Sequence, residues 1–139
     1  MEDKTPEKFS WAARGRSFKY AFQGFGHFLR SQHNAWIHAV AAVVVLAAGW
    51  WLDISALEWC AIVLAIALVI SAELMNTAIE FLVDLVSPEY NELAGKAKDV
   101  AAAGVLIMAI AAAIIGVIVF GPKLLDLFYL NPDGISAWQ

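Results

Sequence analysis

The stretch ALEWCAIVLAIALVISAELMNTAIEFLVDLV, residues 56–86, decides the architecture of this 139-residue chain. Its first half, up to Ile70, contains a single charged residue, Glu58. An apolar stripe continues to Val86, where the pair Ser87-Pro88 predicts the end of the helix because proline cannot continue it. A segment of this length and composition predicts a helix that crosses a membrane.

Two further apolar segments flank this one. Ala35 to Leu52 is interrupted only by His38, and Val100 to Gly121 contains no charged residue. The whole chain is 61% hydrophobic with a mean hydropathy of +0.68, well above an ordinary soluble domain. The sequence therefore predicts an all-α integral membrane protein with three transmembrane helices, at about 34–52, 56–86 and 98–121.

The basic residues predict the orientation in the membrane. Six of the nine Lys and Arg residues precede the first span, Lys96 and Lys98 lie between the second and third, and the loop Asp53–Ser55 has none. Cytoplasmic segments carry an excess of basic residues, so the amino terminus and the second loop are expected in the cytoplasm. Lys123 is the single exception. Nothing in this charge pattern indicates a nucleic-acid partner.

An amphipathic segment precedes the first span. Between residues 16 and 31, apolar side chains recur at helical spacing with polar or basic ones between them, led by Phe18, Phe22, Phe25 and Phe28. This pattern predicts a helix that lies along the membrane surface, with its phenylalanines among the acyl chains.

Four polar residues share one face of the second span: Glu73, Asn76, Glu80 and Asp84, at spacings of three, four and four. Ionisable groups at membrane depth are costly, and they mark an ion or substrate site by default. Polar contacts between helices would account for Asn76 and one carboxylate, and they remain the alternative interpretation. The face is therefore a candidate functional site.

The segment after this helix combines acids and bases: Glu89, Tyr90, Asn91, Glu92, Gly95, Lys96, Lys98 and Asp99. Mg²⁺ is typically held by one or two carboxylates together with substrate phosphates, and lysine serves as a point charge for phosphate oxygens. No glycine-rich phosphate loop of the P-loop type is present. The spacing thus indicates a polyanion bound with Mg²⁺, and names no reaction.

At these residues the sequence resembles a known family. The run ELMNTAIEFLVD at 73–84, followed by SPEYNELAGKAKDVAAA at 87–103, is similar to the prokaryotic diacylglycerol kinases, which include the undecaprenol kinases. The segments Asn34–His38 and Phe18–Tyr20 also fit the family pattern. The resemblance covers roughly Arg16 to Phe120. It makes 16–122 a lipid kinase domain, flanked by tails at 1–15 and 123–139.

The resemblance implies a homotrimer of three-span subunits in the bacterial inner membrane. Each subunit would use ATP and Mg²⁺ to phosphorylate the hydroxyl of a membrane lipid at the cytoplasmic surface. Diacylglycerol is the expected acceptor, by the family's name, and undecaprenol is the alternative within the same family. A non-enzymatic membrane oligomer, whose acidic face lines a shared pore, is the competing class.

The same resemblance assigns roles to individual residues. Glu73 is expected to be the general base, with Asn76 beside it, and Glu80 a metal ligand. The expected ATP-binding residues are Tyr20, Gln32, Glu80, Glu89, Tyr90, Asn91, Lys98 and Asp99, with Asp84, Glu92 and Gly95 in support.

One position departs from the family pattern. The second metal-binding carboxylate normally lies just before the Asn34–His38 segment, where this chain has Gln32. No Asp or Glu occurs between Lys8 and Leu52, so a shift in alignment supplies none. Three outcomes are expected as alternatives. Gln32 is a tolerated metal ligand, or an acid such as Glu92 compensates for the missing carboxylate, or the glutamine impairs metal binding and activity.

The three histidines are expected to have separate roles. His27, His33 and His38 lie at spacings of six and five, which do not share a helix face, so a three-histidine metal site is not expected. His38 fits the family pattern and is expected to fix helix packing.

Overall fold

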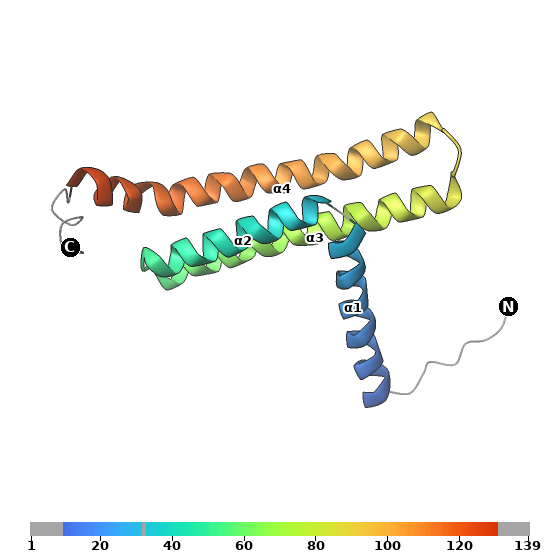
Figure 1. Ribbon diagram of the computed structural model, residues 1–139, viewed down its shortest axis with the longest axis horizontal. Helices are drawn as coiled ribbons and strands as arrows, with labels where there is room; N and C mark the ends of the chain where they lie inside the picture. Colours follow the sequence, from blue (N-terminus) through green and yellow to red (C-terminus); the bar gives the residue numbers. More distant parts are fainter. Residues whose placement is uncertain (1–9, 32, 131–139) are drawn as a thin grey trace.

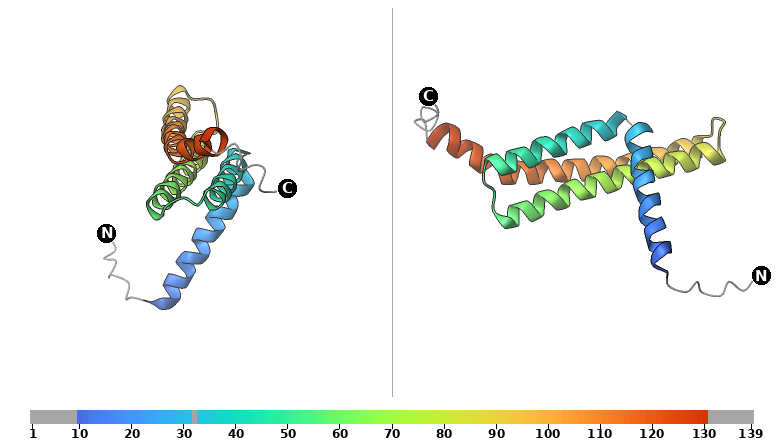
Figure 2. Two further views of the ribbon diagram at one scale, coloured as in Figure 1. Left: turned by 90° about the vertical axis from the view of Figure 1, so that its left-hand side faces the viewer. Right: turned by 60° about the horizontal axis from the view of Figure 1, so that its bottom comes forward.

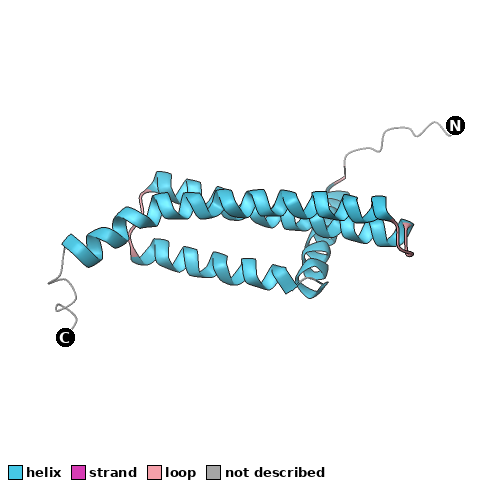
Figure 3. Ribbon diagram, turned by 90° about the horizontal axis from the view of Figure 1, so that it is seen from above, coloured by secondary structure: helices cyan, strands magenta, loops and turns pink. Residues whose placement is uncertain are grey.

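The computed structural model describes residues 10–31 and 33–130, and these residues form helices and short loops without any strand (Figures 1 and 3). The helices are α1 (Trp11–Ser31), α2 (His33–Trp51), α3 (Ala56–Val86) and α4 (Glu92–Leu125), followed by a π-helical turn, η1 (Asp126–Leu130). Gln32, the tail at 1–9 and residues 131–139 lie outside the described residues. The all-helical class expected from the sequence is confirmed.

Three of these helices are long and apolar enough to cross a membrane, as predicted: α2 from Asn34, α3 and α4. With its 19 residues α2 is about 28 Å long, close to the hydrocarbon core of a bilayer at about 30 Å. The 31 residues of α3 and the 34 of α4 reach about 46 Å and 51 Å. Part of each must therefore extend beyond the hydrocarbon.

Part of this extra length lies at the end of the hairpin where a loop joins α3 to α4. Figures 1 and 2 show it projecting past α1 and past the start of α2, to the loop that joins the two long helices. The hairpin end, which contains the acidic end of α3, therefore lies farther along the bundle than the start of α2.

A local sequence signal begins α3. Ser55 Oγ accepts a hydrogen bond from the backbone N–H of Glu58 at 3.4 Å, and the Glu58 carboxylate accepts one from the Ser55 N–H at 2.7 Å. This reciprocal capping box satisfies two backbone donors that the first turn leaves without a helical partner. The other end of α3 is at Val86, where Ser87-Pro88 predicted it.

The ends of α4 differ from the expected span. The helix begins at Glu92, six residues before the predicted start at 98, because Asn91 caps it locally. At its other end it continues through Pro122 to Leu125, so helical structure extends into the predicted tail. Lys123 Nζ lies 3.6 Å from Glu58 Oε2, which gives the one basic residue on this side a partner at the start of α3.

The three membrane helices meet in a thin core. Ile54, Ile62 and Val119 are buried together, and Trp59 packs against them. Gly49 of α2 lies so close to Trp59 that a Cβ there would be 2.9 Å from the indole ring. The large apolar side chains outside this core are mostly exposed, which suits contact with lipid or with other subunits.

The helix α1 points away from the bundle, across the direction of the three long helices (Figures 1 and 2). It begins at Trp11, five residues before the predicted start at 16. Phe28 is buried where α1 meets the bundle, while Phe18 and Phe22 are exposed along the helix. With the bundle across a bilayer, α1 would run along the membrane plane, and its expected role as an amphipathic surface helix stays a prediction.

Candidate functional site

The polar face of α3 runs from a buried to an exposed environment. Glu73 and Asn76 are buried, with 3% and 8% of their surface exposed, Glu80 is half-buried and Asp84 is exposed. Glu73 follows Ala56 by 17 residues, which at about 1.5 Å per residue is about 26 Å along the axis. In a hydrocarbon core of about 30 Å that begins at Ala56, Glu73 would lie near the far border, and Glu80 and Asp84 beyond it.

Asn76 and Glu80 are joined directly. Asn76 Nδ2 donates a hydrogen bond to Glu80 Oε1 at 2.8 Å, across one turn of the helix. Asn76 Oδ1 is buried and, among the described residues, accepts no hydrogen bond. A buried carbonyl oxygen without a donor costs free energy unless another molecule supplies one. The amide is thus an acceptor available to a ligand hydroxyl beside Glu73.

Glu73 has a partner on another helix. His38 of α2 places Nε2 2.9 Å from Glu73 Oε1. Thr77 Oγ1 donates to the backbone carbonyl of Glu73 at 2.9 Å, which satisfies the threonine within its own helix. The carboxylate is therefore held between α2 and α3, at the depth where ionisable groups need a partner.

Asp84 and Lys98 connect the projecting ends of α3 and α4. Lys98 Nζ lies 2.5 Å from Asp84 Oδ1, and both side chains keep contact with solvent. Exposed ion pairs contribute little to stability, about 0–1 kcal/mol. The pair does place an ammonium group on the same side as the acidic face of α3, where a phosphate would need it.

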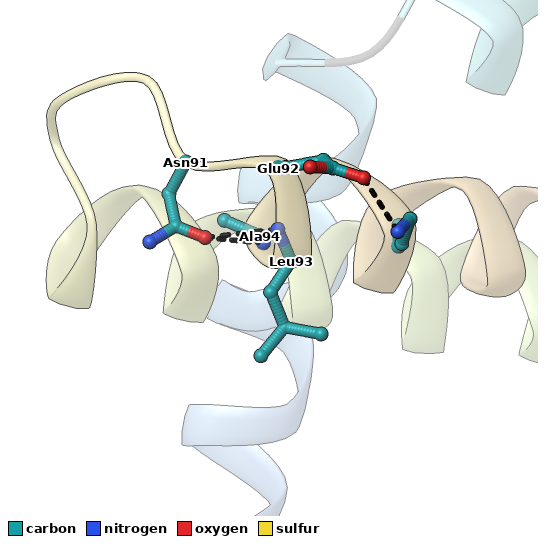
Figure 4. A network of polar contacts seen from close by, with 5 residues as sticks. Asn91, Glu92, Leu93 and Ala94 are labelled. Carbon is teal, nitrogen blue, oxygen red and sulfur yellow. Dashed lines mark hydrogen bonds and ion pairs between the residues drawn. The ribbon is translucent and has the colours of Figure 1, made fainter.

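The loop that follows α3 positions its residues through a helix cap (Figure 4). Asn91 Oδ1 accepts hydrogen bonds from the backbone N–H groups of Leu93 at 2.9 Å and Ala94 at 3.2 Å. Glu92 then pairs with Lys96 one turn later, at 2.6 Å. Gly95, expected in the loop, lies within α4. The side chains of this segment are therefore fixed by the start of the helix.

The remaining predicted residues that the structure describes are exposed. Tyr90 is 95% exposed and Tyr20, on α1, is 65% exposed. Glu89 and Asp99 are exposed on the loop and on α4. Gln32, the predicted second metal ligand, lies outside the described residues. The described part of the chain thus joins Asn76 to Glu80 and Asp84 to Lys98, while the roles of these residues and the nucleotide contacts stay predictions.

The donor set fits Mg²⁺ bound together with phosphate. Over residues 10–31 and 33–130, no group of three or more His, Cys, Asp or Glu side chains is arranged to hold a metal ion by itself. Mg²⁺ usually takes only one or two protein carboxylates and completes its coordination with waters and substrate phosphates. Glu80, hydrogen-bonded by Asn76 and half-buried, supplies such a carboxylate.

The contact between His38 and Glu73 was missed by the sequence analysis, which gave His38 a packing role only. A signal was present, because His38 is the one polar residue that interrupts the stretch Ala35–Leu52. An isolated histidine in an apolar span indicates a buried polar partner. Which partner it meets depends on how α2 packs against α3.

Comparisons with known proteins point to one family. The family model described as prokaryotic diacylglycerol kinase matches residues 19–120. The chain is 42% identical over 109 residues to the undecaprenol kinase of Bacillus subtilis (strain 168), a match that covers 78% of this chain and 89% of that protein.

Two diacylglycerol kinases are also similar. The chain is 43% identical over 112 residues to that of Synechocystis sp., covering 80% of this chain and 64% of the relative. It therefore matches just under two thirds of the length of the Synechocystis protein. It is 34% identical over 104 residues to that of Escherichia coli (strain K12), covering 70% of this chain and 85% of the relative.

Proposed function

Because the chain belongs to the prokaryotic diacylglycerol kinase family, we propose that it transfers the γ-phosphoryl group of ATP to the hydroxyl of diacylglycerol at the cytoplasmic membrane surface. Membership establishes a multi-pass membrane lipid kinase that uses ATP. The observation that carries the proposal further is the burial of the Glu73 carboxylate, about 26 Å along α3 from the start of that candidate span.

Glu73 acts as the general base in this proposal. A lipid hydroxyl at the membrane surface reaches a carboxylate at this depth without leaving the bilayer. The hydroxyl proton passes to Glu73 while the lipid oxygen forms a bond to the γ-phosphorus, and the bond to the β-phosphate oxygen breaks to release ADP. Asn76 Oδ1, buried and open to a donor, orients the hydroxyl beside it.

Glu80 would hold Mg²⁺ together with the phosphates of ATP, and Gln32 would be the second protein ligand. When bound, the ion neutralises charge on the phosphate oxygens during transfer. Asn76 contributes by fixing the Glu80 carboxylate through its hydrogen bond.

The nucleotide is proposed to lie along the projecting hairpin. Lys98, oriented by Asp84, offers its ammonium group to phosphate oxygens, and Asp99 follows it on α4. Exposed loop residues and Tyr20 on α1 complete the proposed contacts: Glu89, Tyr90 and Asn91, supported by Glu92 and Gly95. Phosphoryl transfer needs mostly positioning and charge stabilisation, which a site of this size provides.

Undecaprenol is the second candidate acceptor. The observation that favours it is the similarity to the Bacillus undecaprenol kinase, whose match covers 89% of that protein. The identity of this match is 42%, against 43% for the Synechocystis diacylglycerol kinase. Both lipids present a hydroxyl at the interface and differ in the apolar part that lies in the bilayer. The reaction at Glu73 is the same for either one.

We also propose that the protein works as a homotrimer in the bacterial inner membrane, with its amino terminus in the cytoplasm. The large exposed apolar surface supports association, and small residues along α4, such as Ala112 and Gly116, allow helices to approach closely in lipid. The excess of basic residues before α2 supports the orientation.

The test is Mg²⁺-dependent ATP turnover by the purified protein in mixed micelles, with diacylglycerol or undecaprenol added separately. We expect turnover only with an acceptor lipid, and the lipid that supports it identifies the substrate. Glu73→Gln, which keeps the shape of the side chain, should lower kcat by about 10²- to 10⁴-fold, the usual contribution of a general base. Full activity of this variant would contradict the proposal.

A further inference from the structure

The catalytic carboxylate proposed above is not alone in the membrane, because His38 reaches it from a different helix. The two residues are 35 positions apart in the sequence, yet Nε2 and Oε1 lie 2.9 Å apart. This is the one ion pair or side-chain hydrogen bond that the described part of the chain makes to the Glu73 carboxylate. The carboxylate therefore depends on α2 for its orientation.

The burial of the pair explains why that dependence is strong. The Glu73 side chain is 5% exposed and that of His38 is 23% exposed. A buried carboxylate without a hydrogen-bond donor is costly, and rotation toward water relieves that cost. Such a rotation would remove the base from the lipid hydroxyl. A donor fixed on the neighbouring helix opposes it.

The surroundings of His38 offer its imidazole ring few other hydrogen-bond partners. It borders an apolar cavity of about 280 Å³ between α2, α3 and α4, whose other lining residues are Ala, Val, Ile and Gly. Within residues 10–31 and 33–130, no other polar side chain lines this cavity. A polar ring in such surroundings is oriented by its single strong partner, so Glu73 and His38 hold each other in place.

We infer that His38 is a positioning residue for the phosphoryl transfer: its Nε2–H holds one oxygen of Glu73 so that the other faces the lipid hydroxyl. The inference rests on the proposed role of Glu73 as base. The proton of the lipid still passes to Glu73, and His38 remains bonded to Oε1 before and after that transfer. If His38 served only to pack α2 against α3, the effect of a His38 substitution on turnover would not depend on the residue at position 73.

Kinetics of two His38 variants test the inference. His38→Leu removes the donor at similar volume, and His38→Gln keeps an amide donor. Because a displacement of about 1 Å of a catalytic group costs about 10²-fold, we expect His38→Leu to lower kcat by about 10- to 100-fold with the KM for ATP unchanged. His38→Gln should recover part of the loss. His27→Gln, on the exposed surface of α1, is the matched control and should keep full activity.

A double-mutant comparison separates positioning from packing. In a Glu73→Asp background the carboxylate is one methylene shorter and withdraws from Nε2, so adding His38→Leu should cost less than about threefold more. The same 10- to 100-fold loss in both backgrounds would overturn the inference, as would wild-type kcat in His38→Leu. Full activity of Glu73→Gln would instead overturn the proposed function, so the two failures are distinguishable.

A spectroscopic measurement keeps the test decisive if His38→Leu does not fold. In protein labelled with ¹⁵N-histidine, the Nε2 resonance of His38 should shift on Glu73→Gln, because the charged acceptor becomes a neutral amide. His27→Gln and His33→Gln identify the other two resonances. An unchanged His38 resonance would overturn the inference.

Discussion

At the scale of single residues, the site depends on which polar atoms have partners. Asn76 shows this directly, since its Nδ2 is used by Glu80 while its Oδ1 is buried without a donor among the described residues. In a site that receives a ligand, a donor of the ligand satisfies such an atom, whereas elsewhere it destabilises the fold. The pattern of the acidic face thus supports substrate binding over simple contact between helices.

Gln32 offers a residue-scale prediction about the metal. An amide oxygen can coordinate Mg²⁺ but brings no negative charge, so a carboxylate in its place should bind the ion more tightly. We expect Gln32→Glu to lower the Mg²⁺ concentration that gives half-maximal ATP turnover by about tenfold, which corresponds to about 1.4 kcal/mol.

The measurement is a Mg²⁺ titration of ATP turnover, with Gln32→Leu as the matched variant that has no ligand oxygen. Equal half-maximal concentrations for Gln32, its Glu variant and its Leu variant would show that this position does not bind the metal. Activity found only in Gln32→Glu would mean that the natural glutamine impairs the kinase.

At the scale of helices, the caps and contacts determine where each element lies. The start of α4 depends on Asn91, whose side chain accepts from Leu93 and Ala94. Asn91→Ala should lower the free energy of unfolding by about 1 kcal/mol, the usual cost of losing such a cap. Asn91→Asp keeps an acceptor oxygen and should unfold near the wild-type temperature.

Thermal unfolding in detergent, followed by circular dichroism, compares these two variants. Asn91→Asp also removes the amide N–H₂ group. If that group contacts the nucleotide, this variant should show a raised KM for ATP without a loss of stability. A similar loss of stability in both variants would contradict the capping role.

The contact between α2 and α3 gives a second helix-scale prediction. An added Cβ at Gly49 would meet Trp59 at 2.9 Å and Ile54 at 3.0 Å, while one at Gly104 meets nothing within 4 Å. Gly49→Ala should therefore lower the unfolding temperature, because overpacking costs about 1–3 kcal/mol. Gly104→Ala should hold or raise it, since alanine favours a helix by about 1 kcal/mol over glycine.

The comparison uses the same unfolding measurement in the same detergent. An unfolding temperature for Gly49→Ala equal to or above that of Gly104→Ala would show that the two helices do not approach as closely as the structure places them.

At the scale of the whole molecule, three membrane helices must place the α3–α4 loop and the carboxyl-terminal end on opposite sides. Cys60 is the single cysteine, so a Cys60→Ala background allows one cysteine to be placed at will. Lys96 and Tyr129 are suitable positions, because both are exposed.

We expect a membrane-impermeant maleimide to label Tyr129→Cys in spheroplasts and Lys96→Cys only after lysis. The reason is the excess of basic residues before α2, which favours the cytoplasm for that side. The reverse labelling would invert the proposed orientation, and labelling of both positions in spheroplasts would contradict three spans.

Much of this protein is determined by short-range sequence. The three spans, the stop after Val86 and the alignment of Glu73, Asn76 and Glu80 follow from composition and helical period. They were predictable because a helix relates residues that are three or four apart. The bounds of α1 and α4 were less predictable, since capping by residues such as Asn91 competes with the end of the apolar run.

Only the tertiary structure decided which helices meet at the site. The pairs His38–Glu73, Asp84–Lys98 and Glu58–Lys123 join residues between 14 and 65 positions apart, which no periodicity relates. The sequence by itself determined that a carboxylate lies at membrane depth on α3. The packing of α2 against α3 decided that a histidine holds it, because a buried charge takes the donor that the fold brings within reach.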